Sequence, residues 1–593
     1  MGLQHVLGIL VVALVLLGMP QPSHAQHKII PVDQIKPGMK GYGLTVFRGT
    51  VPEKFNVEVV DVVPNFLLRQ NIILIQCSHP ITDKAGVIGG MSGSPIFING
   101  KLAGALAYGW QFNKEALAGV TPIGPMFDIT RRKQRGSTVQ NPFEKLALFK
   151  TPRQMAEAYI SETFFSKFAS NPRSNLVPAR TPLSLSGFTG ESWKMVEDAL
   201  SPFGMDPMQG GGSGATEEGP DTFVDGGAIG VQMIRGDLSA TGIGTVTTTY
   251  NGQVLAFGHP MFNMGENHLP VTTAKIHTVI ASLARSSKLG RPLREIGSLV
   301  QDRAAGISAR TDLRASMIPV TFHIHDTRSD FDDTYHVEVA NRQWLTPRLI
   351  HSALIQFIQH ACSDATDLSA SIHGKIKIAG RPVFTLDDHG VSRKGLAPLV
   401  GYFRPAAVVN AILTNPFEDA SIESIEFDVT LDYGLSFSYL KGAYMTAANP
   451  LPGDIVNIHA RLVDYGGKES VLSIPFQIPA GTQGKKIKIS VGGGNDILPV
   501  VPTPESLDDL LRNVQQYYPA NAIVITVEVP SETLNVRGRV LYDLPASAAS
   551  ALAPVAGDDE SKSYKTKQTE VYPVETIVSG EHTIQVTVGR RTK

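Results

Sequence analysis

A serine in a glycine-rich turn is the first candidate for chemistry in this chain. The run Gly-Gly-Met-Ser-Gly-Ser-Pro at residues 89–95 holds Ser92 and is followed by the apolar stretch Ile-Phe-Ile at 96–98. Glycine tolerates strained backbone conformations and brings no side chain, so backbone N–H groups can converge with a serine hydroxyl. This pattern is typical of a nucleophile beside an oxyanion hole, which the amides of Gly90 and Ser92 would form. A plain turn between two strands is the competing interpretation, because glycine and serine are common in turns.

Ser94 competes with Ser92 for the role of nucleophile. Ser92 is favoured because it alone has a glycine two residues before it and another one residue after it. The lipase-type elbow Gly-x-Ser-x-Gly would need a glycine at position 94, where this chain has serine. A P-loop or dinucleotide-binding fold is also disfavoured, because no glycine-rich strand-to-helix turn is combined with the required lysine or acidic partner.

A serine hydroxyl is a weak nucleophile near neutral pH and needs a base within hydrogen-bond reach. Of the sixteen histidines, His259 is the candidate because of its position after the strand-like run at 253–257. Gly258 precedes it, and Pro260 follows it and bars continuation of the strand. A histidine at a strand end projects into a cleft more readily than one inside a strand. A structural turn histidine is the competing interpretation.

The serine and histidine blocks together resemble the SpoIVB-type sporulation serine peptidase family. The resemblance rests on Gly-Met-Ser-Gly-Ser-Pro at 90–95 and Phe-Gly-His at 257–259, supported by the run Gly-Asp-Leu-Ser-Ala-Thr-Gly-Ile-Gly-Thr-Val at 236–246. This family is similar to the trypsin-like peptidases as a remote, rearranged relative. The resemblance implies that Ser92 is the nucleophile and His259 the general base, with the amides of Gly90 and Ser92 as oxyanion donors.

The chain departs from the family pattern in two respects. In the sporulation enzyme the histidine block precedes the serine block, whereas here the order is reversed, as if the halves were permuted. A catalytic triad is defined by its geometry, so a different chain order does not exclude one. The acidic residue of the family has no clean counterpart. Asp302 is the preferred third member, although a salt bridge with Arg303 would also explain it; Asp83 is the alternative, and a Ser–His dyad without an acid is a third arrangement. A PDZ-like segment, which the sporulation enzyme carries, is not evident.

Composition and charge exclude several classes of protein. The chain has 593 residues, 42% of them hydrophobic and 18% charged, which is typical of well-packed domains rather than of disorder. A formal net charge of −1 gives no reason to expect nucleic acid or an anionic membrane surface as a partner. The two cysteines, Cys77 and Cys362, and the absence of a CxxC or HExxH pattern argue against a zinc site. We expect no metal and no cofactor; whether the two cysteines pair stays open.

The N-terminal residues 1–25 have the features of a secretory signal. An apolar run at 6–17 is followed by Pro20 and by the small-x-small pattern Ser-His-Ala at 23–25. The run is shorter than the roughly 20 apolar residues that a membrane anchor needs. We therefore expect cleavage near Ala25, a periplasmic or extracellular protein, and no integral membrane span in the mature chain.

The remaining chain predicts a mainly β fold. Short β-branched runs alternate with turns at 29–135 and 226–325, a spacing typical of small barrels or sandwiches. Together with the resemblance, this predicts two small trypsin-like β-barrel halves in permuted order with a helical insert, a helix-containing segment and a C-terminal immunoglobulin-like β-sandwich region. The expected divisions are 1–25 (signal peptide), 26–140 (serine-bearing half), 141–225 (helical insert and glycine-rich linker), 226–330 (histidine-bearing half), 331–420 (α/β segment packing on the peptidase) and 421–593 (C-terminal β-rich module).

These observations lead to one expected function and two alternatives. The expectation is an exported serine endopeptidase that cleaves peptide bonds through an acyl-enzyme at Ser92, with His259 as general base, acting on protein or peptide substrates such as cell-envelope proteins. A non-catalytic secreted scaffold that retains the peptidase fold is the first alternative. An exported esterase that uses the same serine is the second.

Overall fold

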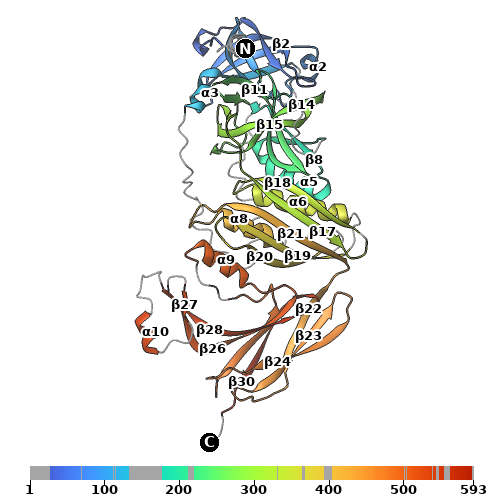
Figure 1. Ribbon diagram of the computed structural model, residues 1–593, viewed down its shortest axis with the longest axis vertical. Coiled ribbons are helices and arrows are strands. Elements are labelled where there is room, and N and C mark those ends of the chain that lie inside the picture. The colour runs from blue at the N-terminus through green and yellow to red at the C-terminus, as the bar shows by residue number, and fades with distance from the viewer. Residues whose placement is uncertain are drawn as a thin grey trace, which may run out of the picture.

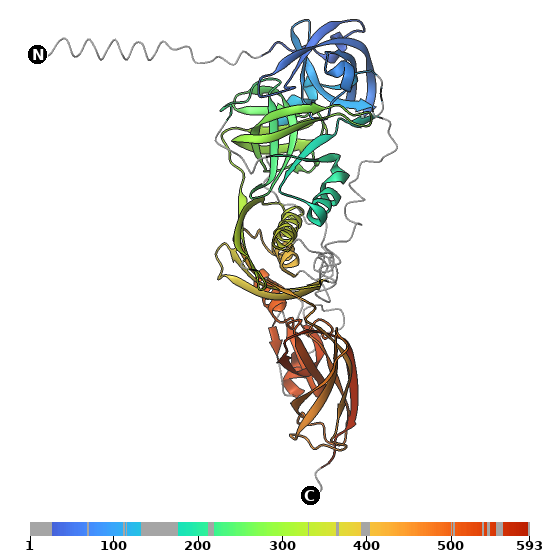
Figure 2. The ribbon, with the colours of Figure 1, turned by 90° about the vertical axis from the view of Figure 1, so that its right-hand side faces the viewer.

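The computed structural model describes residues 27–67, 70–110, 113, 115–131, 176–211, 219–329, 331–362, 367–392, 404–499, 501, 504–536, 539–541, 546–552 and 561–590. The expected signal peptide at 1–25 lies outside the described residues, as does the part of the expected helical insert before residue 176. The described parts follow one another along a long axis: two barrels, a layer of sheet and helices, and a sandwich (Figures 1 and 2). The fold is mainly β, as predicted, with barrel-like halves in its N-terminal part.

The first barrel carries the serine block. Its strands pair in the order β4-β1-β2-β3-β6-β5, and a further pairing of β4 with β5 closes the ring. The interior is filled by the alternating apolar residues of these strands, such as Val57, Val59, Ile73 and Ile75. The elements are η1 (Val32–Gln34), β1 (Lys40–Thr45), β2 (Glu53–Leu67), β3 (Gln70–Ser78), α2 (Thr82–Ala85), β4 (Pro95–Ile98), β5 (Lys101–Trp110), β6 (Leu117–Pro122) and α3 (Ile123–Thr130).

The second barrel carries the histidine block. Its strands pair in the order β10-β14-β15-β16-β12-β11, and β11 pairs back with β10 to close a second ring. The elements are β10 (Ala228–Gly236), β11 (Ser239–Tyr250), β12 (Gln253–Ala256), β13 (Gly265–Glu266), β14 (Pro270–Ile280), β15 (Ser287–Arg303) and β16 (Gly306–Arg310).

The residues just before the second barrel differ from the expected helical insert. They are largely extended because β7 adds to the edge of β5, while β8 pairs with β11 and β9 pairs with β8. One helix, α5, follows β8 and packs on α6 of the next layer. Main-chain pairing with both barrels therefore overrides the helical pattern in this part. The elements are β7 (Leu176–Pro178), β8 (Thr181–Ser186), α5 (Gly190–Leu200), η2 (Ser201–Phe203) and β9 (Met205–Gln209).

A five-strand layer continues the second barrel through the pairing of β18 with β10. The order is β20-β19-β21-β17-β18, and helix α6 lies in the curve of this sheet (Figure 2). The strand β21 belongs here, paired in parallel with β17, although residues from 421 onward were expected in the C-terminal module. Its alternate residues Phe427 and Val429 belong to the same apolar core as α6, and this shared core explains why β21 is part of the middle layer. The elements are β17 (Met317–Asp326), β18 (Asp332–Ala340), α6 (Thr346–Ala361), β19 (Leu368–Ile378), β20 (Phe384–Ser392), α8 (Arg404–Leu413) and β21 (Ile422–Tyr433).

The C-terminal region is a two-sheet sandwich that begins at β22. One sheet has the order β24-β23-β22-β29, and the other β27-β26-β25-β30 with β28 paired to β26. The two sheets share one apolar core, which includes Ile458, Phe476, Ile489 and Ile525. The elements are β22 (Phe437–Met445), β23 (Ile455–Asp464), β24 (Glu469–Gln477), β25 (Lys486–Gly493), α9 (Leu507–Gln515), β26 (Ala522–Val536), β27 (Arg539–Leu541), α10 (Ala546–Leu552), β28 (Ser561–Pro573), β29 (Ile577–Ser579) and β30 (Glu581–Thr587).

The two barrels meet through backbone as well as side chains. Gly93 of the serine turn lies against β11 so closely that a Cβ at that position would be 1.9 Å from the Thr245 carbonyl oxygen. The Thr245 amide donates to the Ser92 carbonyl at 2.8 Å, and the Thr247 hydroxyl donates to the Gly93 carbonyl at 2.8 Å. Gly93 also has φ +97°, a conformation that side-chain-bearing residues rarely adopt. The glycines of the turn are therefore needed to bring the serine onto the second barrel.

Candidate active site

The serine turn leaves two of its amides without an acceptor. In the described part of the chain, the N–H groups of Gly90 and Ser92 donate no hydrogen bond, although both residues are buried. Buried amides are nearly always paired, so two unpaired amides flanking a serine hydroxyl indicate a place for a ligand oxygen. The neighbouring amides of Gly89, Met91, Gly93 and Ser94 each donate to a backbone carbonyl.

The histidine is held by a strained connection at the end of β12. Phe257 has φ +69°, which is exceptional for an aromatic residue, and its buried ring fills the space that a side chain on Gly244 would need. Gly258 also has a positive φ, and its carbonyl accepts a hydrogen bond from the Thr121 hydroxyl of the first barrel at 2.6 Å. Such strained backbone conformations persist only where surrounding contacts hold them, and they are common at functional sites. Here it turns His259 toward the serine-bearing barrel.

Ser92 and His259 come together between the barrels. The Ser92 Oγ atom lies 2.8 Å from His259 Nε2, within the range expected for a nucleophile and its general base. The other ring nitrogen, Nδ1, lies 2.8 Å from the Pro260 carbonyl oxygen. A carbonyl can only accept, so the Pro260 carbonyl favours the neutral tautomer with its proton on Nδ1, which leaves the lone pair on Nε2. In this conformation the Ser92 hydroxyl donates to the Ala179 carbonyl oxygen, so Nε2 can accept the serine proton only after that carbonyl moves. Burial lowers the pKa of His259, while the carbonyls of Pro260 and Ala179 act in the opposite direction.

Asp302 is near this pair but does not occupy the expected third position. One carboxylate oxygen accepts from the Met261 amide at 2.8 Å, and the other accepts from the Phe262 amide at 2.6 Å and the Asn263 amide at 3.0 Å. The carboxyl is fully buried, and burial raises its pKa to about 6 against the lowering effect of these amides. The expectation of an acid directly on the imidazole is therefore corrected: a backbone carbonyl holds Nδ1, and Asp302 holds the loop that carries this carbonyl.

The alternative residues have local structural contacts. Asp83 accepts from the His79 amide at 3.2 Å at the start of α2, on the exposed surface. The Ser94 hydroxyl donates to the Met91 carbonyl at 2.7 Å within the turn. Cys77 and Cys362 are both buried and form no disulfide in the described part of the chain, and burial raises the pKa of Cys77 to about 12.

A backbone carbonyl from another segment covers the pair. The Ser92 hydroxyl donates to the Ala179 carbonyl oxygen at 2.9 Å, and His259 Nε2 lies 3.1 Å from the same oxygen. Ser92 is 0% exposed and His259 is 2% exposed. The pair is therefore closed to solvent in this conformation.

A small cavity of about 80 Å³ adjoins the closed pair. Its wall includes Ala179, Gly89 of the serine turn, and the charged side chains of Arg180, Arg285 and Asp206. Asp206 Oδ1 lies 3.3 Å from an Arg180 nitrogen and 3.4 Å from an Arg285 nitrogen. The cavity thus places charged side chains beside Ala179, whose carbonyl covers the Ser92–His259 pair.

Lys288 lies beneath the serine turn and was not anticipated from the sequence. Its backbone amide donates to the Gly89 carbonyl at 2.9 Å, and its ammonium nitrogen lies 2.7 Å from Thr45 Oγ1 and 3.3 Å from Thr245 Oγ1. The Thr245 hydroxyl in turn donates to the Gly90 carbonyl at 2.8 Å. Because a peptide N–H points away from its carbonyl, the Lys288–Gly89 bond fixes the direction of the Gly90 N–H.

The buried ammonium of Lys288 should make stability depend on pH. Burial lowers the pKa of Lys288 to about 7 from its ordinary 10.5. Between these values the unfolded chain binds more protons than the folded one, so the stability of the wild type should rise with pH relative to Lys288→Met. We expect a relative gain of about 2 kcal/mol between about pH 7 and about pH 9, measured by urea unfolding. Parallel pH profiles for the two proteins would contradict this expectation.

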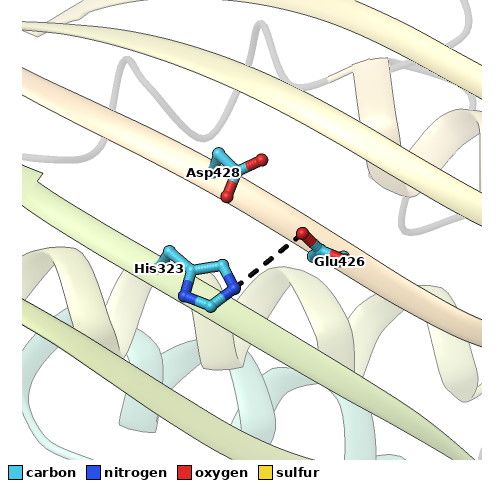
Figure 3. A group of neighbouring side chains, drawn as sticks. All are labelled: His323, Glu426 and Asp428. Atoms are coloured by element: carbon cyan, nitrogen blue, oxygen red, sulfur yellow. Dashed lines mark ion pairs between the residues drawn. The ribbon is translucent and has the colours of Figure 1, made fainter.

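A separate cluster of metal-ligand types lies on the sheet of the middle layer (Figure 3). Ligand atoms of His323, Glu426 and Asp428 lie within 4.8 Å of one another. However, the Lys375 ammonium lies 2.8 Å from Glu426 and 3.2 Å from Asp428, and it already supplies the positive charge. These residues sit on adjacent strands and are about 40% exposed, so we interpret the cluster as a cross-strand ion-pair network.

Comparison with known proteins finds a similarity between the serine-bearing part of the chain and a family of peptidases. Residues 18–119 match the family model described as SpoIVB peptidase S55. The match contains Ser92 and confirms the resemblance to this family. It ends before His259 and does not show the permuted order of the two blocks. No curated protein and no solved structure matches the chain. Among the described residues, no helix is long and apolar enough to cross a membrane.

Proposed function

We propose that this chain is an exported serine endopeptidase whose nucleophile is Ser92 and whose general base is His259. The observation that carries the proposal is the 2.8 Å approach of Ser92 Oγ to His259 Nε2 beside two unpaired amides. The SpoIVB peptidase match over the serine block supports the same chemistry. Export rests on the signal-like sequence at 1–25, and cell-envelope proteins are the proposed substrates.

The geometry supports an acyl-enzyme mechanism. Ser92 Oγ attacks the carbonyl carbon of a peptide bond while its proton passes to His259 Nε2. The amides of Gly90 and Ser92 donate to the oxygen that becomes negative. The imidazolium then gives its proton to the leaving amine, and a water molecule, deprotonated by the same nitrogen, hydrolyses the acyl-enzyme.

Asp302 is a positioning residue in this proposal. The Pro260 carbonyl that accepts from His259 Nδ1 and the Met261 N–H that donates to Asp302 belong to one peptide group. A carboxylate bonded to the N–H end makes the carbonyl end a stronger acceptor. Asp302 therefore orients the imidazole and stabilises its protonated form through a single peptide group.

The proposal is tested with a fluorophosphonate probe, which reacts with an activated serine without needing a known substrate. The full chain should be labelled, and mass spectrometry should locate the adduct on Ser92. Ser92→Ala and His259→Ala should both prevent labelling, whereas Ser94→Ala should retain it. A folded chain that is not labelled in any form would favour the non-catalytic scaffold, for which the closed conformation of the pair is the supporting observation. Hydrolysis of simple esters without hydrolysis of peptides would favour the esterase.

The pH dependence of activity follows from the shifted pKa of His259. The base must be neutral, and burial lowers its pKa, so kcat/KM should fall on acidification with a midpoint at or below about pH 6.5. Burial raises the pKa of Asp302 to about 6, so its protonation would fall in the same range. Measuring the profile for the wild type and for Asp302→Asn separates the two groups. A midpoint above about pH 7 in both proteins would contradict the assignment of His259 as the base.

A further inference from the structure

The segment at residues 176–180, called the strap below, occupies the site as an extended chain. Its strand β7 pairs antiparallel with β5, with Val177 opposite Gly109 and Pro178 opposite Tyr108. The pairing continues at Ala179, whose amide donates to the Ala107 carbonyl at 2.8 Å. In the first barrel, β4 pairs only with the first half of β5. On that side the second half of β5 is therefore an open edge, which can pair with one more strand.

The strap meets both reactive atoms without being placed for cleavage. Its Ala179 carbonyl oxygen accepts from Ser92 Oγ and lies 3.1 Å from His259 Nε2. Within the described chain, the amides of Gly90 and Ser92 remain without an acceptor, so this oxygen is not held by the groups that would stabilise a tetrahedral intermediate. The strap therefore blocks the nucleophile and the base and does not present a scissile bond.

The surroundings of the strap fit this role. Gly89 allows a close approach, because a Cβ at that position would lie 3.0 Å from the Arg180 carbonyl oxygen. The Arg180 side chain pairs with Asp206, which also lies 3.4 Å from Arg285. Arg180 and Asp206 are about 30% exposed, so this ion pair is a weak latch that a competing chain can open.

We propose that residues 176–180 are an internal occupant of the peptide-binding edge of β5, and that the protein acts on a substrate only after an extended segment of that substrate displaces them. This inference rests on the proposed function of Ser92 and His259. It adds that the protein as folded is latent, and that the partner that activates it is a polypeptide able to pair with β5.

A reversible lock tests the proposal. Trp110 and Leu176 are directly opposite in the β5–β7 register, a separation that a disulfide can span. The variant Trp110→Cys/Leu176→Cys should react with the fluorophosphonate at least about tenfold more slowly when oxidised than when reduced. The reduced form of the same protein is the control for folding and for the two substitutions.

The latch gives a second readout with a smaller effect. Arg180→Ala should speed labelling by about two- to fivefold, and hydrogen exchange of the Ala179 amide should accelerate by a similar factor. Lys441→Ala, which removes an exposed ion pair in the sandwich, is the matched control and should change neither rate. Equal labelling rates of the oxidised and reduced Trp110→Cys/Leu176→Cys variant would contradict the proposal that the strap blocks the site, while leaving the proposed function in place. Absence of labelling in every form would overturn the proposed function, and unchanged exchange at Ala179 in Arg180→Ala would overturn the latch.

Discussion

Ser92→Ala is expected to lower the turnover of a peptide substrate by about 10⁴- to 10⁶-fold, because no other group can form the acyl-enzyme. His259→Ala should cause a loss of similar size, since Oγ then has no base at 2.8 Å. Residues that act as one unit are not additive, so the double variant should be little worse than either single variant. The measurement is steady-state hydrolysis of an unstructured protein substrate. Each substitution is compared with its parent protein, once in the wild-type background and once in the Arg180→Ala background.

Ser94→Ala is the matched control for this prediction. Ser94 is as fully buried as Ser92 and lies in the same turn, but its hydroxyl donates to the Met91 carbonyl. We expect a small loss of stability of about 1 kcal/mol and a turnover within about tenfold of the wild type. If Ser94→Ala abolished turnover and Ser92→Ala did not, the assignment of the nucleophile would be wrong.

Asp302→Asn is expected to lower kcat by about 10²-fold with little change in KM, because the charge that supports the Pro260 carbonyl is lost. The substitution also places an amide N–H₂ against backbone N–H donors, so the free energy of unfolding should fall by about 2–3 kcal/mol. Both effects are measured on one preparation, by steady-state kinetics and by urea unfolding.

Asp326→Asn separates catalysis from stability. Asp326 is also buried and also holds a turn, since it accepts from the Arg328 amide at 3.0 Å and from the Ser329 hydroxyl at 2.8 Å. It lies at the end of β17, in the middle layer of the molecule. We expect its substitution to reduce stability and to leave kcat unchanged. An equal loss of kcat in both variants would show that Asp302 has only a structural role.

The sequence predicted the parts of the site that depend on residue type and local pattern. Within the regions 29–135 and 226–325, where strands and turns were expected to alternate, the β-branched runs at 57–63, 71–76, 228–234 and 242–250 all lie in strands of the two barrels. The glycine turn and the strand-ending histidine could be found because glycine, proline and histidine have strong local preferences. Their approach in space, across 167 positions of chain, came from a family resemblance and not from local physics.

The remaining features depend on backbone groups and on tertiary contacts. The groups that hold or cover His259 are the carbonyls of Pro260 and Ala179, and every residue type carries a carbonyl, so no residue pattern marks them. Asp302 was predicted to bond to the imidazole because acids are usual there, but a sequence cannot show that one peptide group lies between them. Lys288 gave no signal because a lysine in a strand-like run normally points to solvent, whereas here its stem packs on Gly90.

The most direct test of Ser92 as the nucleophile is the structure of the protein after reaction with a fluorophosphonate. We expect phosphorus bonded to Ser92 Oγ, a phosphonyl oxygen accepting from the amides of Gly90 and Ser92, His259 Nε2 still beside Oγ, and the Ala179 carbonyl displaced. An adduct on another residue, or an adduct on Ser92 whose oxygen lies away from both amides, would contradict this expectation.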